Sequence, residues 1–366
     1  MLTEHNVLPI ALGDNWIYAL PSSEGVLLID AGPDYDGAWD ALQAQLDAAG
    51  LGDSEIWGIV ITHAHIDHCG LAARWQERGR TIFGSEAEFP RFAQGDQVIG
   101  FQSDLVFALM ADSGVPPDRI ANFREGRRRM REAFRKAIAA PQPSAGGETA
   151  TAEPDTERLP ETKDAKPARR TRRERWPGMI RGTPFQPQHV LSDGDVLNVG
   201  ERTIHFIEAP GHTPGNAVCY EPATGALFSG DQLLPHVTPN PGIHFATDGS
   251  ETRFRSLPAF TRSMEKVREL GASHLYPGHG EYVPEVAPII ERTLEHHRKR
   301  QDRIRRFLRA GPLTPYAVLL KFFPHLPDGR LWQATGEIVG HIDALLEAGV
   351  VAEERNADGQ LLIRLS

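Results

Sequence analysis

The chain has 366 residues, a formal net charge of −10 and a hydrophobic content of 40%, which is enough for one large domain and one small domain. It contains no run of about 18 apolar residues, so we expect no membrane span. The first nine residues lack the order of a secretory signal, and two cysteines, Cys69 and Cys219, cannot form a disulfide framework. We therefore expect a cytoplasmic protein.

Basic residues are concentrated in three stretches, 124–136, 163–175 and 298–309, and each stretch holds seven of them. The remainder of the chain is therefore strongly acidic, which argues against a broad nucleic-acid-binding surface. We interpret the three stretches as solvated helix faces and a polar linker, which is the ordinary role of such charge runs.

The first part of the chain alternates short apolar runs with helical patterns. Apolar runs bounded by turn residues predict strands, and apolar residues at helical spacing before a glycine predict helices. These patterns predict strands at 17–20, 26–30, 56–61 and 81–85, and helices at 36–50 and 71–78.

The pattern of residues 86–185 predicts a helical insertion. Its segment 141–175 is rich in Pro, Thr, Glu, Ala and charge, so we expect a disordered linker there. The apolar residues of 89–110 suggest helices packed over the site. They either belong to a core or form an apolar wall for a substrate, and the sequence leaves both readings open.

The strand pattern returns after residue 190. It predicts strands at 196–199, 203–207, 217–220, 226–228 and 274–276, and a helix at 255–270.

The most informative stretch follows the buried strand 56–61. Four residues that can bind metals come within six positions after Thr62: His63, His65, Asp67 and His68. The first three alternate, so an extended backbone would project them to one side, whereas His68 points elsewhere. Imidazole and carboxylate are usual zinc ligands, and one short loop could therefore serve two neighbouring metal positions.

Three later places repeat one design, in which an apolar strand leads to a glycine-rich bend and one ligand-type side chain. These side chains are His212, Asp231 and His279. With the first cluster they make five imidazoles and two carboxylates, enough for two metal sites with a shared carboxylate. Asp30 also ends an apolar strand, and it either caps a turn or accepts a proton from a ligand histidine.

Together these motifs resemble the metallo-β-lactamase superfamily. The match consists of His63-Ala-His65-Ile-Asp67-His68, His212 in Pro-Gly-His-Thr-Pro-Gly, Ser229-Gly230-Asp231 and Pro277-Gly278-His279-Gly280, in the family's order. The resemblance covers about residues 7–290 apart from the insertion. It implies an α/β (α+β) fold, an αββα sandwich of two mixed sheets with helices outside, as a catalytic domain at 1–290.

The resemblance also implies a ligand set, carried over by position. The first metal would be bound by His63, His65 and His212, the second by Asp67, His68 and His279, and Asp231 would bridge them. The expected cofactor is two Zn²⁺ per chain, with Fe or Mn as alternatives. The pattern is similar to the glyoxalase II-like branch.

Two departures from other branches narrow the chemistry. Asp231 stands where lactamases with a cysteine ligand have that cysteine. The oxygen-reducing diiron branch typically has Glu in place of His65, so the resemblance favours hydrolysis over redox chemistry. We interpret Cys69 and Cys219 as small packing residues.

The C-terminal residues 291–366 resemble a small winged-helix domain, with helices at 285–308, 314–323 and 332–348 and a hairpin formed by 350–353 and 361–365. The last helix carries Glu337, Asp343 and Glu347 and no Arg or Lys, the wrong charge for phosphate contact. We therefore expect a packing or dimerisation role, and a homodimer as one outcome.

The predicted function is dinuclear zinc hydrolysis, in which a metal-bridging hydroxide, oriented by Asp67 and Asp231, attacks a thioester or ester/lactone carbonyl of a small, partly apolar acyl substrate. The expected partner is this small molecule, with neither membrane nor nucleic acid. Tyr276, His236 and His244 are candidate general acids and substrate-binding residues. The alternatives are a metal-dependent RNase or phosphodiesterase, a DNA-reading regulator whose metal site senses a ligand, and a minor β-lactamase activity.

Overall fold

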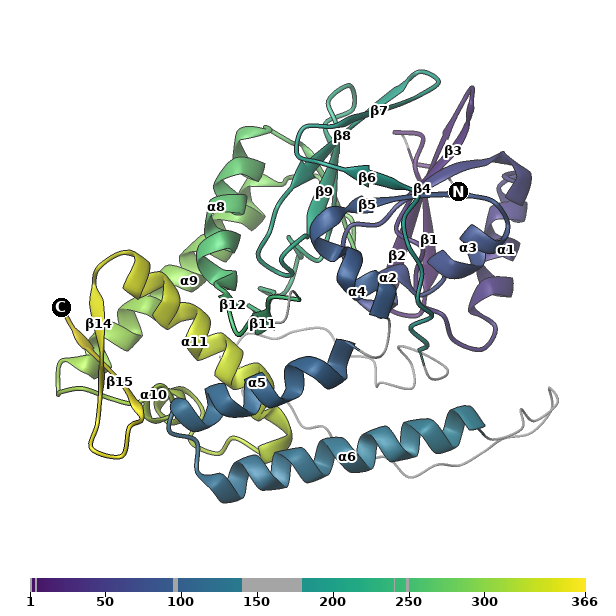
Figure 1. Ribbon diagram of the computed structural model, residues 1–366. Helices are drawn as coiled ribbons and strands as arrows, with labels where there is room; N and C mark the ends of the chain where they lie inside the picture. The colour runs from purple at the N-terminus through teal and green to yellow at the C-terminus, as the bar shows by residue number, and fades with distance from the viewer. Residues whose placement is uncertain (1, 4, 95–97, 140–179, 240, 248–249) are drawn as a thin grey trace.

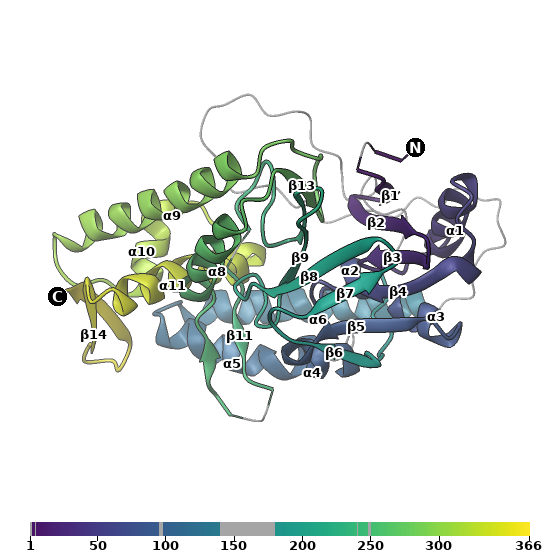
Figure 2. The same ribbon diagram turned by 90° about the horizontal axis from the view of Figure 1, so that it is seen from above.

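The computed structural model describes residues 2–3, 5–94, 98–139, 180–239, 241–247 and 250–366. Two β-sheets lie face to face and helices cover them on the outside, as Figures 1 and 2 show. The predicted linker 141–175 lies outside the described residues.

The first sheet has six strands in sequence order. They are β1 (Leu8–Leu12), β2 (Asn15–Ser22), β3 (Gly25–Ile29), β4 (Ile56–Val60), β5 (Thr81–Ser85) and β6 (His189–Leu191). The pairs β1–β2 and β2–β3 are antiparallel, and the pairs from β3 to β6 are parallel. The chain leaves this sheet after β5 for the whole insertion and returns to it at β6.

The second sheet has five strands in the order β13-β10-β9-β8-β7. Their bounds are β7 (Val196–Val199), β8 (Arg202–Glu208), β9 (Ala217–Glu221), β10 (Ala226–Gly230) and β13 (His274–Pro277). Only β13 pairs in parallel, with β10. Both sheets are therefore mixed, as predicted.

Strand alternation assigns each side chain to one of two faces. On β3, Leu27 and Ile29 lie in the core between the sheets, whereas Val26 and Leu28 face the outer helices. On β10, Phe228 points between the sheets and Leu227 points outward. This period of two gives each sheet an apolar side toward the other sheet and an apolar side toward a helix layer.

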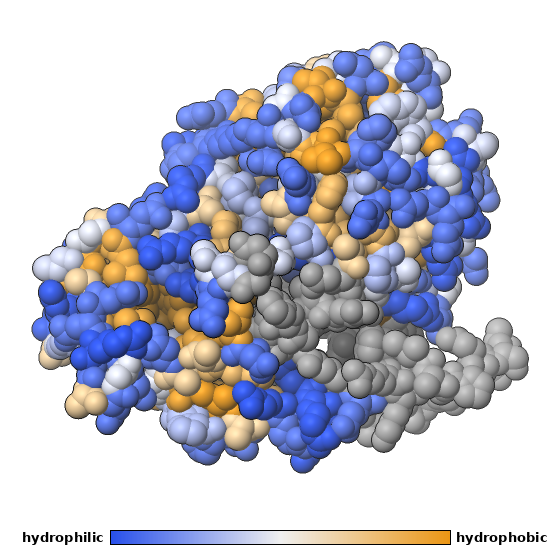
Figure 3. Space-filling model, in the orientation of Figure 1, coloured by the Kyte–Doolittle hydropathy of each residue, from blue (hydrophilic) through white to orange (hydrophobic). Residues whose placement is uncertain are grey.

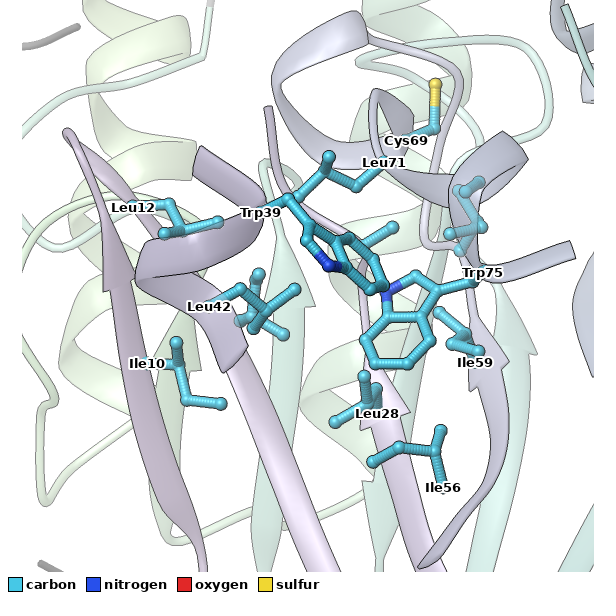
Figure 4. Close-up of a cluster of buried hydrophobic side chains, with 14 of the residues drawn as sticks. Ile10, Leu12, Leu28, Trp39, Leu42, Ile56, Ile59, Cys69, Leu71 and Trp75 are labelled. Carbon is cyan, nitrogen blue, oxygen red and sulfur yellow. The ribbon is translucent and has the colours of Figure 1, made fainter. Parts of the chain in front are cut away.

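The outer core of the first sheet is closed by α1 (Ala38–Ala48) and α3 (Ala72–Glu77). Trp39 of α1 and Trp75 of α3 meet edge to face with ring centroids 4.7 Å apart. Figure 4 shows both indoles above Leu28, Ile56 and Ile59. The ligand-bearing segment between β4 and α3 is therefore held at both ends by well-packed apolar residues.

On the second sheet the outer layer is formed by α8 (Ser256–Glu269) and α9 (Ala287–Leu308). Phe260 and Met264 of α8 and Ile290 of α9 pack against the outward residues of the strands. The αββα sandwich predicted from the sequence is confirmed.

The insertion contains α4 (Phe89–Gln94), α5 (Val98–Asp112) and α6 (Pro117–Ala139). Phe92 of α4 packs in the core of the first sheet, and Val106, Phe107 and Met110 of α5 pack in a separate core. These described apolar residues therefore serve core packing, and the idea that they form an open wall for an acyl chain is not supported. The side chain of Phe101 lies outside the described residues.

The separate core joins the insertion to the C-terminal elements. It includes residues of α9, α10 (Pro315–Phe322), α11 (Leu331–Glu347), β14 (Val351–Arg355) and β15 (Leu361–Leu365). The predicted boundary between residues 290 and 291 falls inside α9. Figure 3 shows apolar side chains gathered over this block. Three helices and a hairpin occur in the predicted order, and the winged-helix identity stays a prediction.

No helix in the described part of the chain combines the length and apolar character needed to cross a membrane.

Candidate metal centre

Four chain segments bring their polar side chains to one edge of the sandwich. His63, His65, Asp67 and His68 follow β4, and the last two lie on the short helix α2 (Ile66–Cys69). His212 lies between β8 and β9, Asp231 follows β10, and His279 follows β13. The seven predicted ligands therefore converge from segments that lie far apart in the sequence.

The first group consists of His63, His65, His212 and Asp231, whose ligand-type atoms all lie within 4.8 Å of one another. His65 Nδ1 lies 3.0 Å from His63 Nε2 and 3.0 Å from His212 Nε2. Ligand atoms around one tetrahedral zinc ion, with bonds of about 2.0–2.1 Å, stand about 3.3 Å apart. The three imidazoles are thus arranged as ligands of one cation.

The second group consists of Asp67, His68 and His279. His279 Nε2 lies 3.4 Å from Asp67 Oδ2, again close to the separation of two ligands on one cation.

Asp231 links the two groups. Its Oδ1 lies 3.4 Å from His68 Nε2, and its Oδ2 lies 3.6 Å from His212 Nε2 and 3.5 Å from His279 Nε2. Among the described residues, the buried carboxylate oxygen Asp231 Oδ1 has no hydrogen-bond partner. This orphaned oxygen and the purely imidazole and carboxylate donor set fit a dinuclear divalent-metal site, and they fit zinc, iron or manganese.

Two glycines make this close approach possible. A Cβ on Gly278 would stand 2.5 Å from the His68 ring and 2.8 Å from Asp231 Oδ1. A Cβ on Gly230 would stand 2.5 Å from Thr62 Oγ1, and its φ of +49° also favours glycine. The bends that deliver Asp231 and His279 therefore need these residues.

Asp30 lies behind His68, as the sequence suggested for a residue that supports a ligand. Its Oδ2 accepts a hydrogen bond from His68 Nδ1 at 2.7 Å, and its Oδ1 accepts from Thr62 N at 2.8 Å. The first bond turns His68 Nε2 toward Asp231 and fixes the tautomer. Asp30 has a φ of +65°, an uncommon conformation that these hydrogen bonds hold in place.

Other ligand histidines are oriented in the same way. Thr62 Oγ1 lies 3.1 Å from His63 Nδ1, and His279 Nδ1 donates to the carbonyl of Asp14 at 2.9 Å. Asn15 Nδ2 lies 3.3 Å from His68 Nε2. No sequence pattern indicated Asp14 and Asn15, because Asp14 in the β1–β2 turn and Asn15 at the start of β2 approach the site only in the folded chain.

The electrostatics differ between the two groups. Burial, followed by the neighbouring imidazoles, lowers the pKa of His63 well below its ordinary value and that of His212 to about 3. Burial likewise lowers the pKa of His65. The first group therefore presents neutral imidazoles, the form that binds a metal.

In the second group burial opposes the charged forms, but the opposite charges outweigh it. The carboxylates of Asp231 and Asp30 raise the pKa of His68 well above its ordinary value, and Asp231 and Asp67 raise that of His279 to about 9. The same pairs hold the pKa of Asp67 and of Asp231 well below the usual range. A cation at this position must displace protons from these imidazoles.

The three candidate substrate residues lie in different surroundings. Tyr276 is 1% exposed, stacks on Phe228 between the sheets and places its hydroxyl 2.8 Å from His5 Nδ1. Its role as a substrate-binding residue or general acid stays a prediction. His236 is exposed beside Gly280. His244 is part of β11 (His244–Phe245), and its Nε2 lies 3.0 Å from the carbonyl oxygen of His212.

Two residues at the start of the insertion were not predicted as site residues. Glu88 is fully buried, and its Oε1 accepts a hydrogen bond from Gly215 N at 2.6 Å, which ties the insertion to the His212 loop. Arg91 on α4 is 8% exposed. The only sequence signal for either was a charged residue beside the aromatic residues Phe89 and Phe92.

Both cysteines are buried and free, and burial raises the pKa of each thiol. This agrees with their interpretation as packing residues and leaves no reactive thiolate at the site.

Comparison with known proteins also relates this chain to metal-dependent hydrolases of one superfamily. The model of the metallo-beta-lactamase superfamily matches residues 11–279. The "probable metallo-hydrolase YqjP" of Bacillus subtilis is 26% identical over 337 residues, which is 92% of this chain and 89% of that protein. An atrochrysone carboxyl ACP thioesterase of Aspergillus fumigatus is 24% identical over 121 residues, 33% of this chain and 34% of that protein.

Two solved structures share the fold over nearly the whole chain. A metallo-beta-lactamase family protein from Thermus thermophilus has a TM-score of 0.67 and 24% identity, covering 98% of both chains. A beta-lactamase domain protein from Burkholderia ambifaria has a TM-score of 0.66 and 18% identity, covering 98% of this chain and 91% of that one. By its sequence, its fold and its paired metal-binding groups, the chain belongs to the metallo-beta-lactamase superfamily.

Proposed function

We propose that this chain is a dinuclear zinc hydrolase that cleaves a thioester, or an ester or lactone, of a small, partly apolar acyl substrate. The observation that carries the proposal is Asp231, whose two oxygens lie 3.4–3.6 Å from histidines of both metal-binding groups. Two bound cations would supply a water of lowered pKa and polarise the carbonyl of the substrate.

The chain's own residues supply orientation. Asp67 and Asp231 stay ionised at neutral pH because their pKa values lie well below the usual range, so each can accept a hydrogen bond from a water. At that pH neither carboxylate carries a proton, so neither can act as a general acid. Asp30, through His68, and Asp14, through His279, hold the second group in place from behind.

The leaving group favours the thioester. A thiol has a pKa of about 8.5, so its thiolate can leave with little protonation, whereas an alkoxide or amine needs a general acid. His244 contacts the backbone of His212 and has a pKa lowered by burial, which suits it poorly to that role. The relative named as an ACP thioesterase supports the same choice by analogy over one third of the chain.

The phosphodiesterase alternative depends on the basic stretches, and part of their described charge is paired with carboxylates. On α6, Arg128 and Arg129 pair with Glu125. On α9, Arg298 pairs with Glu295 and Arg305 with Asp302. No described feature favours this alternative, or β-lactam hydrolysis, over acyl hydrolysis.

The test is a substrate panel on protein with full zinc occupancy: acyl-CoA, acyl-glutathione and lactones, with a β-lactam and a phosphodiester as comparisons. We expect turnover of a thioester, ester or lactone, and loss of turnover and metal in His65→Ala with the fold retained. His325→Ala, at an exposed histidine, is the matched control. No turnover of any thioester, ester or lactone would refute the proposal, and preferential phosphodiester cleavage would select the alternative.

A further inference from the structure

We propose that Arg91 binds an anionic group of the substrate, either a carboxylate on the acyl part or a phosphate on the carrier. This inference rests on the proposed function, which supplies the hydrolysis of the substrate. The binding of the anionic group by Arg91 can be tested without hydrolysis. Arg91 would then determine specificity: it holds the remote end of the substrate, while the scissile carbonyl lies at the metal centre.

The first observation is that Arg91 is a buried cation without a carboxylate. It is 8% exposed, and its one hydrogen bond to a described residue runs from Nη1 to the carbonyl of Ala87 at 3.4 Å. Among the described residues no carboxylate oxygen lies within 4.0 Å of its guanidinium. The comparably buried Arg202 pairs with Glu221 at 2.9 Å. A buried charge without a partner is costly, so this position suits an anionic partner that the described residues do not supply.

The second observation is the position of Arg91 beside a ligand loop. The turn before α4 packs directly on the His212 loop, because a Cβ on Gly215 would lie 2.9 Å from Ala87 Cβ and 2.8 Å from Glu88 Cγ. Ala87 is also the residue whose carbonyl Arg91 contacts. Figure 1 shows α4 and the β11–β12 hairpin (β12, Arg253–Phe254) on the same side of the two sheets.

The positive charge of Arg91 also acts on His244. The positive charge of Arg91 is, after burial, the second cause of the lowered pKa of His244, and His244 Nε2 contacts the His212 carbonyl. Glu88, the carboxylate nearest to Arg91 in sequence, accepts a hydrogen bond from Gly215 N with its Oε1. Among the described residues Arg91 therefore lies beside the His212 loop without a carboxylate partner of its own.

The third observation is access. Buried nitrogen atoms without a hydrogen-bond partner include one guanidinium nitrogen of Arg202 and none of Arg91. The nitrogens of Arg91 without a partner among the described residues therefore keep some contact with solvent. A planar guanidinium of this kind recognises carboxylate or phosphate through paired N–H donors.

The kinetic test uses matched substrates: a glutaryl thioester with a free carboxylate and the corresponding butyryl thioester. The metal-loaded protein should prefer the anionic substrate by roughly ten- to a hundredfold in kcat/KM, the value of one or two hydrogen bonds to a charged group. Arg91→Gln should bring this ratio close to one, mainly through KM. Arg91→Lys keeps the positive charge but loses the paired N–H donors of the guanidinium, so it should retain part of the preference. Arg309→Gln, at an exposed arginine, is the control.

The binding test needs no turnover. Glutarate, butyrate and inorganic phosphate are titrated calorimetrically into the metal-loaded protein and its Arg91→Gln variant. We expect glutarate or phosphate to lose roughly tenfold or more of its affinity in the variant, while butyrate does not. Loss for glutarate assigns the anion to the acyl part, and loss for phosphate assigns it to the carrier.

The two proposals fail separately. Hydrolysis with the same substrate preference and the same anion affinities in Arg91→Gln would overturn the role of Arg91 and leave the hydrolase intact. Arg91-dependent anion binding without hydrolysis of any acyl substrate would overturn the hydrolase and leave the anion site. Should Arg91→Gln unfold, Arg91→Lys tests the role of Arg91 instead. An unchanged preference for the anionic substrate in Arg91→Lys would contradict recognition through the paired N–H donors of the guanidinium.

Discussion

At the scale of single residues, the site depends on groups that never touch a metal. Asp30 connects His68 to Thr62, and each of its oxygens has an assigned donor. Asp231 instead has one oxygen without a hydrogen-bond partner in the described part of the chain, and it faces histidines of both groups. One carboxylate therefore positions a ligand, while the other is placed to be a ligand.

Asp30→Asn should weaken the second metal position and leave the first unchanged. The amide can present its NH₂ group to His68 Nδ1, which removes the acceptor that fixes this ring. Loss of such a supporting group typically lowers metal affinity by about 10–100-fold. Competitive zinc titration measures the two positions separately, with the exposed Glu24→Gln as the control. Equal weakening of both positions would contradict this account.

Metal loading should depend on pH at the second position only. His279 has a pKa of about 9 in the metal-free chain, so a proton competes with the cation below that value, whereas the pKa of His212, about 3, removes such competition. Each proton displaced from His68 or His279 should lower affinity at the second position roughly a hundredfold between about pH 8 and pH 6. Calorimetry in buffers of different ionisation enthalpy counts the protons released. A pH-independent second affinity would refute the assignment.

At the scale of elements, the contact between the insertion and the His212 loop is the structural link that the sequence did not show. Glu88 ends the short helix η2 (Glu86–Glu88) and accepts a hydrogen bond from Gly215 N inside the core. A buried backbone N–H left without its acceptor carries a penalty of about 1–3 kcal/mol. The insertion therefore helps to hold the first metal-binding group.

Glu88→Ala should loosen the His212 loop. We expect lower affinity at the first metal position, by about tenfold, together with reduced stability of the metal-free chain. Glu86→Ala changes an exposed carboxylate of the same short helix and serves as the matched control. Amide hydrogen exchange at Gly215 reports the loop directly, and unchanged protection in Glu88→Ala would show that this contact does not hold it.

Sequence patterns predicted the elements well where the signal is local. The strand 81–85, the ligand run after β4 and the three glycine-bounded ligands need only neighbouring residues to be recognised. Tyr276 shows the limit of such patterns. It follows a residue that faces α8, so strand alternation turns it between the sheets, and only the register of β10 with β13 reveals this. Glu88 and Arg91 escaped prediction because their significance arises from contacts with residues far away along the chain.

At the scale of the whole molecule, the insertion and the C-terminal elements form one apolar unit. Val106 and Met110 of α5 share a core with Ile338 and Ile342 of α11. The helix α9 runs without interruption from the second sheet into this unit. The sandwich is therefore joined to the C-terminal block by α9, and the insertion is joined to the same block by α5.

Truncation after residue 290 should expose these apolar faces. The shortened chain would lose most of α9 and every C-terminal partner of α5, so we expect aggregation, or strong binding of a hydrophobic dye with poorly cooperative unfolding. Size-exclusion chromatography and urea denaturation compare it with the full chain. A soluble 1–290 chain with cooperative unfolding would show that the C-terminal block is an independent domain.

The central claim is that the seven converging side chains hold two cations for hydrolysis. Metal analysis of the purified chain, paired with activity before and after chelation, tests it most directly. We predict two divalent ions per chain, loss of hydrolysis on chelation, recovery on adding zinc, and loss of both ions and activity in Asp231→Ala with the fold retained. Full hydrolytic activity in a metal-free chain, or in Asp231→Ala, would contradict the account.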